Sequence, residues 1–344
     1  PHHSVSARWL DAGDPQQRAE LFAGVPLPGE GDAAPFAWAH RALCRQGLRL
    51  RIDGAPGAPS GETVWLQLRH QPRAAVEAPL LVVDVAEGVR CMLIETHERV
   101  PAQCGQRLAQ NLHIHLRLAP GATLQHLRVA TPGADDQVAH LVHAQLGRGA
   151  HYHQALVASG SQYHLQRTAL QLQGTQASAR TAGVLFAGGA ALEQQVQTSH
   201  SAAHTASAVE ALVLASGKAH AVANAHTCIA PGADGADARQ RLSGIPLAGQ
   251  PRLVLRPHLE IHHDKVQAAH GATWGALPED ALFYARQRGL DEASARALII
   301  EGMATALLER CFDDAETLAT LLADGLLART IARHLAAAQE PHHG

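Results

Sequence analysis

The chain has 344 residues, with 28 basic and 31 acidic side chains and a formal net charge of −3. This balance lacks the excess of Lys and Arg expected of a nucleic-acid-binding protein, so we expect no nucleic-acid partner. Residues 1–20 contain no apolar run typical of a signal peptide, and no segment approaches the roughly 18 apolar residues of a membrane helix. We therefore expect no membrane association.

Five cysteines, an odd number without CxxC spacing, argue against a disulfide framework or a thiolate zinc site. They are Cys44, Cys91, Cys104, Cys228 and Cys311. Cys228 and Cys311 have apolar neighbours and are interpreted as buried structural thiols. The expected compartment is the reducing cytoplasm.

Residues 1–77 form an N-terminal region with several Pro/Gly turns and one helix predicted over residues 36–43. Residues 78–274 change to a two-residue rhythm, which predicts strands at 80–85 and 113–118. Strand–Gly–Ala–strand units then recur: Gly121 and Gly149 lie 28 positions apart, Gly189 and Gly217 again 28, and Gly217 and Gly232 only 15. This uneven repeat favours a right-handed parallel β-helix core. An antiparallel sandwich with Gly-Ala hairpins would show a similar periodicity and remains an alternative.

Residues 275–344 are predicted to form a C-terminal helical domain. A first helix is expected to begin near Pro278 and stop at Gly289, and Asp291 is the expected N-cap of a second helix. The buried face of this second helix is predicted from the spacing of its apolar residues, namely Ala295, Leu298, Ile299, Gly302, Met303, Ala306 and Leu307. A last helical segment is expected over residues 314–338.

Three linked motifs lie near the end of the predicted β-helix and in the helices that follow: residues 258–273 read HLEIHHDKVQAAHGAT, residues 282–284 read LFY, and residues 286–290 read RQRGL. In this order and spacing they resemble the SufB/SufD family, the scaffold subunits of the SUF iron–sulfur cluster assembly system. A weaker match, HSAAHTAS, covers residues 200–207. The form HGAT resembles the D-type (SufD) subunit rather than the B-type. Trp274 and Glu210 depart from the family pattern, which puts detailed interface contacts in doubt.

The resemblance implies a non-catalytic scaffold subunit that pairs with a SufB-type homologue and with SufC-type ABC ATPases, a homodimer being an alternative arrangement. It implies that His270 faces the shared interface, where iron or a nascent cluster is held transiently with the partner and not tightly by this chain alone. Residues 239–247 contain no cysteine, so the thiolate would come from the B-type subunit. The residues implied to dock the ATPase are Leu282, Phe283, Tyr284, Arg286, Arg288, Gly289, Leu298, Ile299 and Met303.

A second candidate metal site comes from the residues alone. On a strand, Glu260, His262 and Asp264 share one face, and carboxylates with an imidazole suit a hard or borderline cation, although such faces are more often simply solvated. A solvated outer face is likewise the favoured interpretation for four further residues: His113, His115, Gln125 and His126.

Recognised nucleotide-binding and hydrolase motifs are absent from the sequence, so we expect ATP hydrolysis to belong to a partner. Two other functional classes remain open. A β-helical carbohydrate-active enzyme would need paired carboxylates, but Glu260 and Asp264 would lie about 13–14 Å apart on a strand. A cytosolic metal-binding protein would use the 24 histidines.

Overall fold

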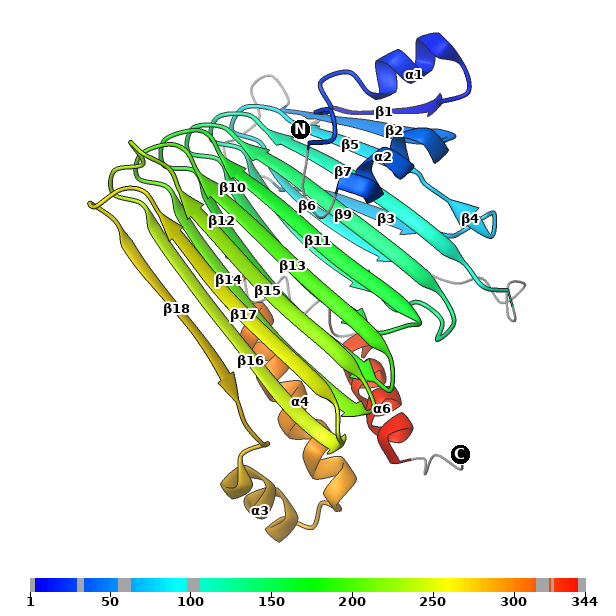
Figure 1. The fold of residues 1–344 in the computed structure, drawn as a ribbon, viewed down its shortest axis with the longest axis vertical. Helices are drawn as coiled ribbons and strands as arrows, with labels where there is room; N and C mark the ends of the chain where they lie inside the picture. The colour runs from blue at the N-terminus through cyan, green and yellow to red at the C-terminus, as the bar shows by residue number, and fades with distance from the viewer. Residues whose placement is uncertain are drawn as a thin grey trace.

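The computed structural model describes residues 4–29, 34–54, 63–97, 106–313, 322 and 325–339. Cys104 and most of the connection before the last helix lie outside these residues. The described chain is mainly β and forms a parallel β-solenoid in which successive strands from residue 80 onward alternate between two long sheets (Figure 1). The predicted β-helix is thus confirmed, and the antiparallel sandwich is wrong because neighbouring strands of the stack run parallel.

The first sheet, called sheet A here, follows the order β1-β2-β5-β7-β9-β11-β13-β15-β17, with β4 beside β7. Its strands are β1 (Ser4–Asp11), β2 (Gln46–Asp53), β4 (Val76–Glu77), β5 (Leu80–Val85), β7 (Ala109–Leu118), β9 (Gln137–Leu146), β11 (Tyr163–Leu172), β13 (Ala191–His200), β15 (His220–Ile229) and β17 (Arg252–Ile261). Of these, β1 is the one that pairs antiparallel.

The second sheet, called sheet B, follows the order β18-β16-β14-β12-β10-β8-β6-β3. Its strands are β3 (Thr63–His70), β6 (Arg90–His97), β8 (Thr123–Ala130), β10 (His151–Ser159), β12 (Ser178–Gly188), β14 (Ala206–Gly217), β16 (Asp237–Gly249) and β18 (Gln267–Trp274). Both sheets include a strand that precedes residue 78, because β2 pairs with β5 and β3 pairs with β6.

The main core fills the space between the two sheets, because alternate residues of each strand point inward. In β14, for example, Val209, Ala211 and Val213 belong to this core, while Leu212 and Leu214 belong to a second cluster on the outer face of sheet B. Strands that are buried on both faces explain why much of the chain reads as nearly continuous small or β-branched apolar residues.

The glycine spacing noted in the sequence follows from the corners of the solenoid. Gly121 has a φ of 68° and donates its N–H to the carbonyl of Arg148, which directly precedes Gly149 one turn later. Gly189 likewise bonds Ser216, which precedes Gly217. The 28-residue intervals are therefore full turns of two strands, whereas the 15 residues from Gly217 to Gly232 span one strand and a corner. Glycine suits these corners because it adopts positive φ without steric cost.

Helices cover parts of both outer faces. α1 (Pro15–Leu21) and α2 (Ala34–Leu43) lie on the outer face of sheet A near β1, where Leu21 packs with Leu80 and Val82. α4 (Glu292–Glu309) and α6 (Leu326–Gln339) pack on the outer face of sheet B, whereas α3 (Glu279–Gln287) lies beyond the ends of the strands (Figure 1). No helix in the described part of the chain is both long and apolar enough to cross a bilayer.

The buried face of α4 matches the predicted one only in part, because Ala295 and Leu307 are buried as predicted whereas Leu298, Gly302 and Ala306 are exposed. Asp291 caps its first turn by accepting the N–H of Ser294, as expected, but its buried residues are Ala295, Ile300, Ala304, Leu307 and Leu308. Leu298, placed in the buried face by the spacing, is instead 56% exposed. Apolar residues surround α4 on all sides, so periodicity alone did not identify the face that contacts sheet B.

Candidate functional site at the last turn of the solenoid

The last turn of the solenoid ends in two strands that each pair on one side only. In the described residues, β17 pairs with β15 and β18 pairs with β16, and the other edge of each strand is free. All of β18 is exposed except the partly buried Ala272. A free strand edge presents a row of unpaired N–H and C=O groups that can template pairing with another chain.

The two free edges differ in their capacity to pair. In β17, the N–H groups of Arg252 and His262 bond to β15, so the N–H groups of odd-numbered residues point to the free edge. Pro257 stands at one of these positions, where its missing donor interrupts the free edge and leaves the ladder with β15 intact. β18 contains no proline, so its free edge is continuous.

His270 lies in the middle of β18, opposite Gln240 of β16, and is exposed. It shares a strand face with Ala272, which packs against the core, so His270 continues the inner face of the sheet at the end of the solenoid. Gly271 beside it has open space around its Cα. The imidazole is therefore accessible at the open end.

A charged cleft of 670 Å³ borders His270 and extends across β14, β16 and β18. Glu210 of β14 lies on its wall and accepts two hydrogen bonds from Arg310, at 2.8 and 3.3 Å, with Arg241 3.9 Å away. Glu210, one of the departures from the family pattern, thus ties the end of α4 to the strand beneath it.

The predicted face of Glu260, His262 and Asp264 is only partly assembled. His262 Nε2 lies 2.7 Å from Glu260 Oε1, and His226 Nε2 lies 3.4 Å from Glu260 Oε2. Asp264 is separate, since it lies in the following turn, 4.0 Å from His263.

Cys228, opposite Glu260 in the strand register, joins this group instead of Asp264, and the ligand atoms of Cys228, Glu260 and His262 all lie within 4.8 Å of one another. The interpretation of Cys228 as buried is wrong, because its side chain is partly exposed on the outer face of sheet A. Cys311, by contrast, is buried as predicted.

The helical residues singled out in the sequence fall into two sets. Phe283, Tyr284 and Leu298 are 66, 60 and 56% exposed. Leu282, Ile299 and Met303 are partly buried against sheet B and are therefore less available to a partner. The polar members Arg286 and Arg288 are exposed, and Gly289 ends α3 with a φ of 91°.

Two histidines expected on a solvated outer face are buried. His126 points into the interior, where its ring bonds Glu95 and Tyr152, and His113 is covered by α2, with its ring 3.9 Å from that of His40. Gln125 is also buried. The two-residue periodicity shows which residues share a strand face. It does not show that α2 covers His113 or that His126 meets Glu95 inside the solenoid, because both contacts depend on tertiary structure.

The architecture is that of a parallel β-solenoid whose last two strands leave a free edge. A family model described as "SUF system FeS cluster assembly, SufBD core domain" matches residues 68–303, well over half of the chain. The chain therefore belongs to the SufBD family of SUF-system iron–sulfur cluster assembly proteins.

Individual relatives agree with this assignment. The chain is 25% identical over 252 residues, 70% of its length, to 54% of an iron–sulfur cluster assembly SufBD family protein of Synechocystis. It is 31% identical over 101 residues, 29% of its length, to 24% of the iron–sulfur cluster assembly protein SufD of Escherichia coli. It is 32% identical over 180 residues, 49% of its length, to 46% of a SufBD family protein of Mycobacterium leprae. The chain thus matches about half or less of the length of these relatives.

Proposed function

We propose that the chain is a SufD-type, non-catalytic scaffold subunit of a cytoplasmic SUF complex and that the free edge of β18 is its contact with a SufB-type homologue. The observation that carries the proposal is the continuous, exposed edge of β18 with His270 at its centre. Strand-to-strand pairing at such an edge extends a sheet across two chains through main-chain hydrogen bonds.

A homologue suits this edge better than a second copy of the chain, because the last three strands of the solenoid contain no thiolate to bind a cluster. Residues 237–274, which form the last three strands, contain no cysteine. Imidazole is a ligand for iron and for iron–sulfur clusters, but clusters are held chiefly by thiolates. His270 would thus supply one ligand to iron or a nascent cluster, and a thiolate would come from the partner.

A SufC-type ATPase would contact the exposed residues of α3 and α4. Tyr284 and Arg288 form a preorganised pair, with the guanidinium 4.7 Å from the ring centroid and an NH2 group 2.5 Å from the hydroxyl. Phe283 and Leu298 add exposed apolar area, and aromatic and Arg side chains are enriched at protein interfaces. Of the predicted docking residues, these four are therefore the strongest candidates.

Glu260 and His262 would take part in metal capture on the outer face, with Cys228 as a third donor. Thiolate, imidazole and carboxylate together bind iron or zinc. Because β17 belongs to the last turn and β15 to the turn before it, iron held there would lie at the same end of the solenoid as the proposed interface.

The test is co-expression of the chain with its SufB-type and SufC-type homologues, followed by native mass spectrometry. The Ala268→Pro variant should lose the complex, because the N–H of Gln267 bonds to β16 and that of Ala268 therefore faces the free edge. Ala268→Ser is the matched control and should assemble normally. A complex that persists in Ala268→Pro would overturn the assignment of this edge, and a homodimer in place of the heterocomplex would overturn the choice of partner.

A further inference from the structure

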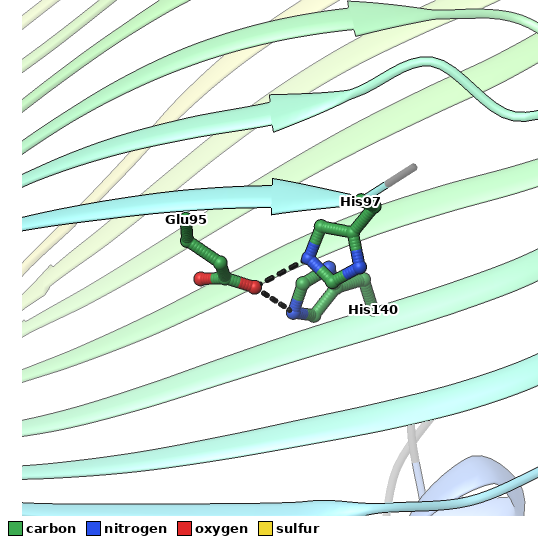
Figure 2. A group of neighbouring side chains, drawn as sticks. All are labelled: Glu95, His97 and His140. Carbon is green, nitrogen blue, oxygen red and sulfur yellow. Dashed lines mark hydrogen bonds and ion pairs between the residues drawn. The ribbon is translucent and has the colours of Figure 1, made fainter. Parts of the chain in front are cut away.

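A buried group of metal-ligating side chains lies inside the solenoid, far along the stack from His270. Glu95 and His97 come from β6 of sheet B, and His140 comes from β9 of sheet A (Figure 2). Glu95 Oε1 lies 2.5 Å from His97 Nε2 and 3.3 Å from His140 Nε2. One ligand atom from each of the three residues lies within 4.8 Å of the others.

The second oxygen of Glu95 is held by other residues. Oε2 accepts hydrogen bonds from His126 at 2.9 Å and from Arg128 at 3.4 Å, and Arg128 also donates to Gln166 at 3.0 Å. These contacts fix the carboxylate so that Oε1 faces the two histidines. A carboxylate that is oriented by neighbours outside the ligand set is a common feature of protein metal sites.

In the described part of the chain, each of the two histidines has a buried ring nitrogen without a hydrogen-bond partner. His140 is 1% exposed, and within the described residues its Nδ1 makes no hydrogen bond, while its Nε2 has only the 3.3 Å contact with Glu95; Nδ1 of His97 is likewise buried without a hydrogen bond. A buried polar group without a partner is costly, so such a group in a native protein calls for a bound ligand, ion or water.

There is room for an ion and a path to it. A void of 20 Å³ touches His97, His140 and His164. A void of about 10–15 Å³ is large enough to hold one water molecule. A larger cavity of 710 Å³ is lined by Glu95, His97 and His140 together with His70 and Glu77. The carboxylate of Glu77, 3.4 Å from His70, adds negative charge on the side from which a cation would enter.

We propose that Glu95, His97 and His140 form a site for one divalent transition-metal ion, Zn²⁺ or Fe²⁺, inside the solenoid. Two imidazoles and one carboxylate are a ligand set for both ions, with bonds of about 2.0–2.2 Å for Zn²⁺. Two ligand atoms of a tetrahedral ion lie about 3.3–3.6 Å apart at these bond lengths. The 3.3 Å between Glu95 Oε1 and His140 Nε2 already fits this geometry, whereas the 2.5 Å between Glu95 Oε1 and His97 Nε2 must open to admit the ion. The ion would join sheet B to sheet A, and this site does not depend on the proposed partner interface.

The test is Zn²⁺ binding to the untagged full chain, by calorimetry in competition with a chelator of known affinity. His140→Gln should lose one tightly bound equivalent per chain, together with the rise in melting temperature that Zn²⁺ gives the parent chain. His200→Gln is the matched control, because His200 is also a buried inward histidine but bonds Thr205 and Ser207 instead. His200→Gln should keep the tightly bound Zn²⁺ ion.

A second variant guards against loss of folding in the first. His97→Gln changes a side chain that is 13% exposed, and it should remove the same equivalent. Anomalous diffraction at the zinc edge should place the ion between Glu95, His97 and His140. Unchanged tight binding in both variants, or an anomalous peak elsewhere and none here, would overturn the site and leave the group as a hydrogen-bonded network that only orders the core.

Discussion

At the scale of single residues, His270 is exposed and does not belong to the hydrophobic core. An exposed side chain away from caps and cores typically changes the free energy of unfolding by less than about 0.5 kcal/mol when it is replaced. We therefore expect His270→Ala to fold and to assemble with the proposed partners, but to abolish cluster maturation in cells because the proposed iron ligand is lost. Activity of an iron–sulfur reporter enzyme measures this, beside native mass spectrometry of the complex.

His220→Ala is the matched control for His270→Ala, since His220 is another exposed histidine on a strand of the last turns. It should leave both assembly and maturation unchanged. Normal maturation in His270→Ala would remove this residue from the mechanism without affecting the assignment of the β18 edge.

Cys228 allows a separate prediction on the outer face of sheet A. Burial, followed by the nearby charge of Glu260, raises the pKa of its thiol, so the thiol is protonated at neutral pH. Metal binding must then release this proton, and affinity should rise with pH. We expect Co²⁺ to give a thiolate charge-transfer absorption that strengthens with pH and disappears in Cys228→Ser.

Cys311→Ser is the comparison for Cys228→Ser, because Cys311 is buried and its pKa is raised to about 12 by burial. The cobalt absorption should survive that change. An unaltered absorption in Cys228→Ser would show that another thiol binds the ion.

At the scale of elements, one face of α4 packs on sheet B and the opposite face is exposed. Leu308 is buried on sheet B, whereas Leu298 is exposed. Leu298→Glu combined with Phe283→Glu should therefore abolish binding of the ATPase subunit and leave stability nearly unchanged. Leu308→Ala should instead cost about 2–5 kcal/mol, because it leaves a cavity.

Pull-down with the ATPase subunit and urea denaturation separate these two effects. If the double variant still binds the ATPase with unchanged affinity, the docking surface lies elsewhere on the chain. If it unfolds at much lower urea than the parent, Leu298 or Phe283 supports the fold more than its exposure indicates.

At the scale of the whole molecule, buried histidines make stability depend on pH. Burial lowers the pKa of His40, His164, His200 and His334 to about 4. In the unfolded chain these groups titrate near 6.5, so the unfolded state binds more protons between pH 6.5 and 4. Their contribution to stability is therefore complete above about pH 6.5 and is lost as the pH falls toward 4.

The expected loss of stability is large, because lowering the pKa of one histidine from 6.5 to about 4 corresponds to about 3 kcal/mol of free energy of unfolding. Native domains have about 5–15 kcal/mol of stability in total. Urea midpoints should thus fall steeply from pH 7 to pH 5, and the chain should unfold near pH 4–5. Equal midpoints at pH 7 and pH 5 would contradict the buried neutral state of these rings.

The sequence could predict the features that depend on local pattern. The two-residue rhythm located β5 and β7, the repeated glycines indicated the turns, and Asp291 marked the start of α4. It could not predict features that depend on which face is covered. Glu95, His97 and His140 meet only because β6 and β9 lie on opposite sheets, and Cys228 reaches Glu260 only through the register of β15 and β17.

The two ends of the solenoid differ in what they offer to another chain. Antiparallel β1 ends sheet A on one side and packs against α1, whereas the other end of the solenoid presents the continuous free edge of β18. Head-to-tail addition would produce filaments, while a contact between two open ends closes on itself. An assembly joined only through the β18 edge should therefore end after two solenoids, because each chain offers one such edge.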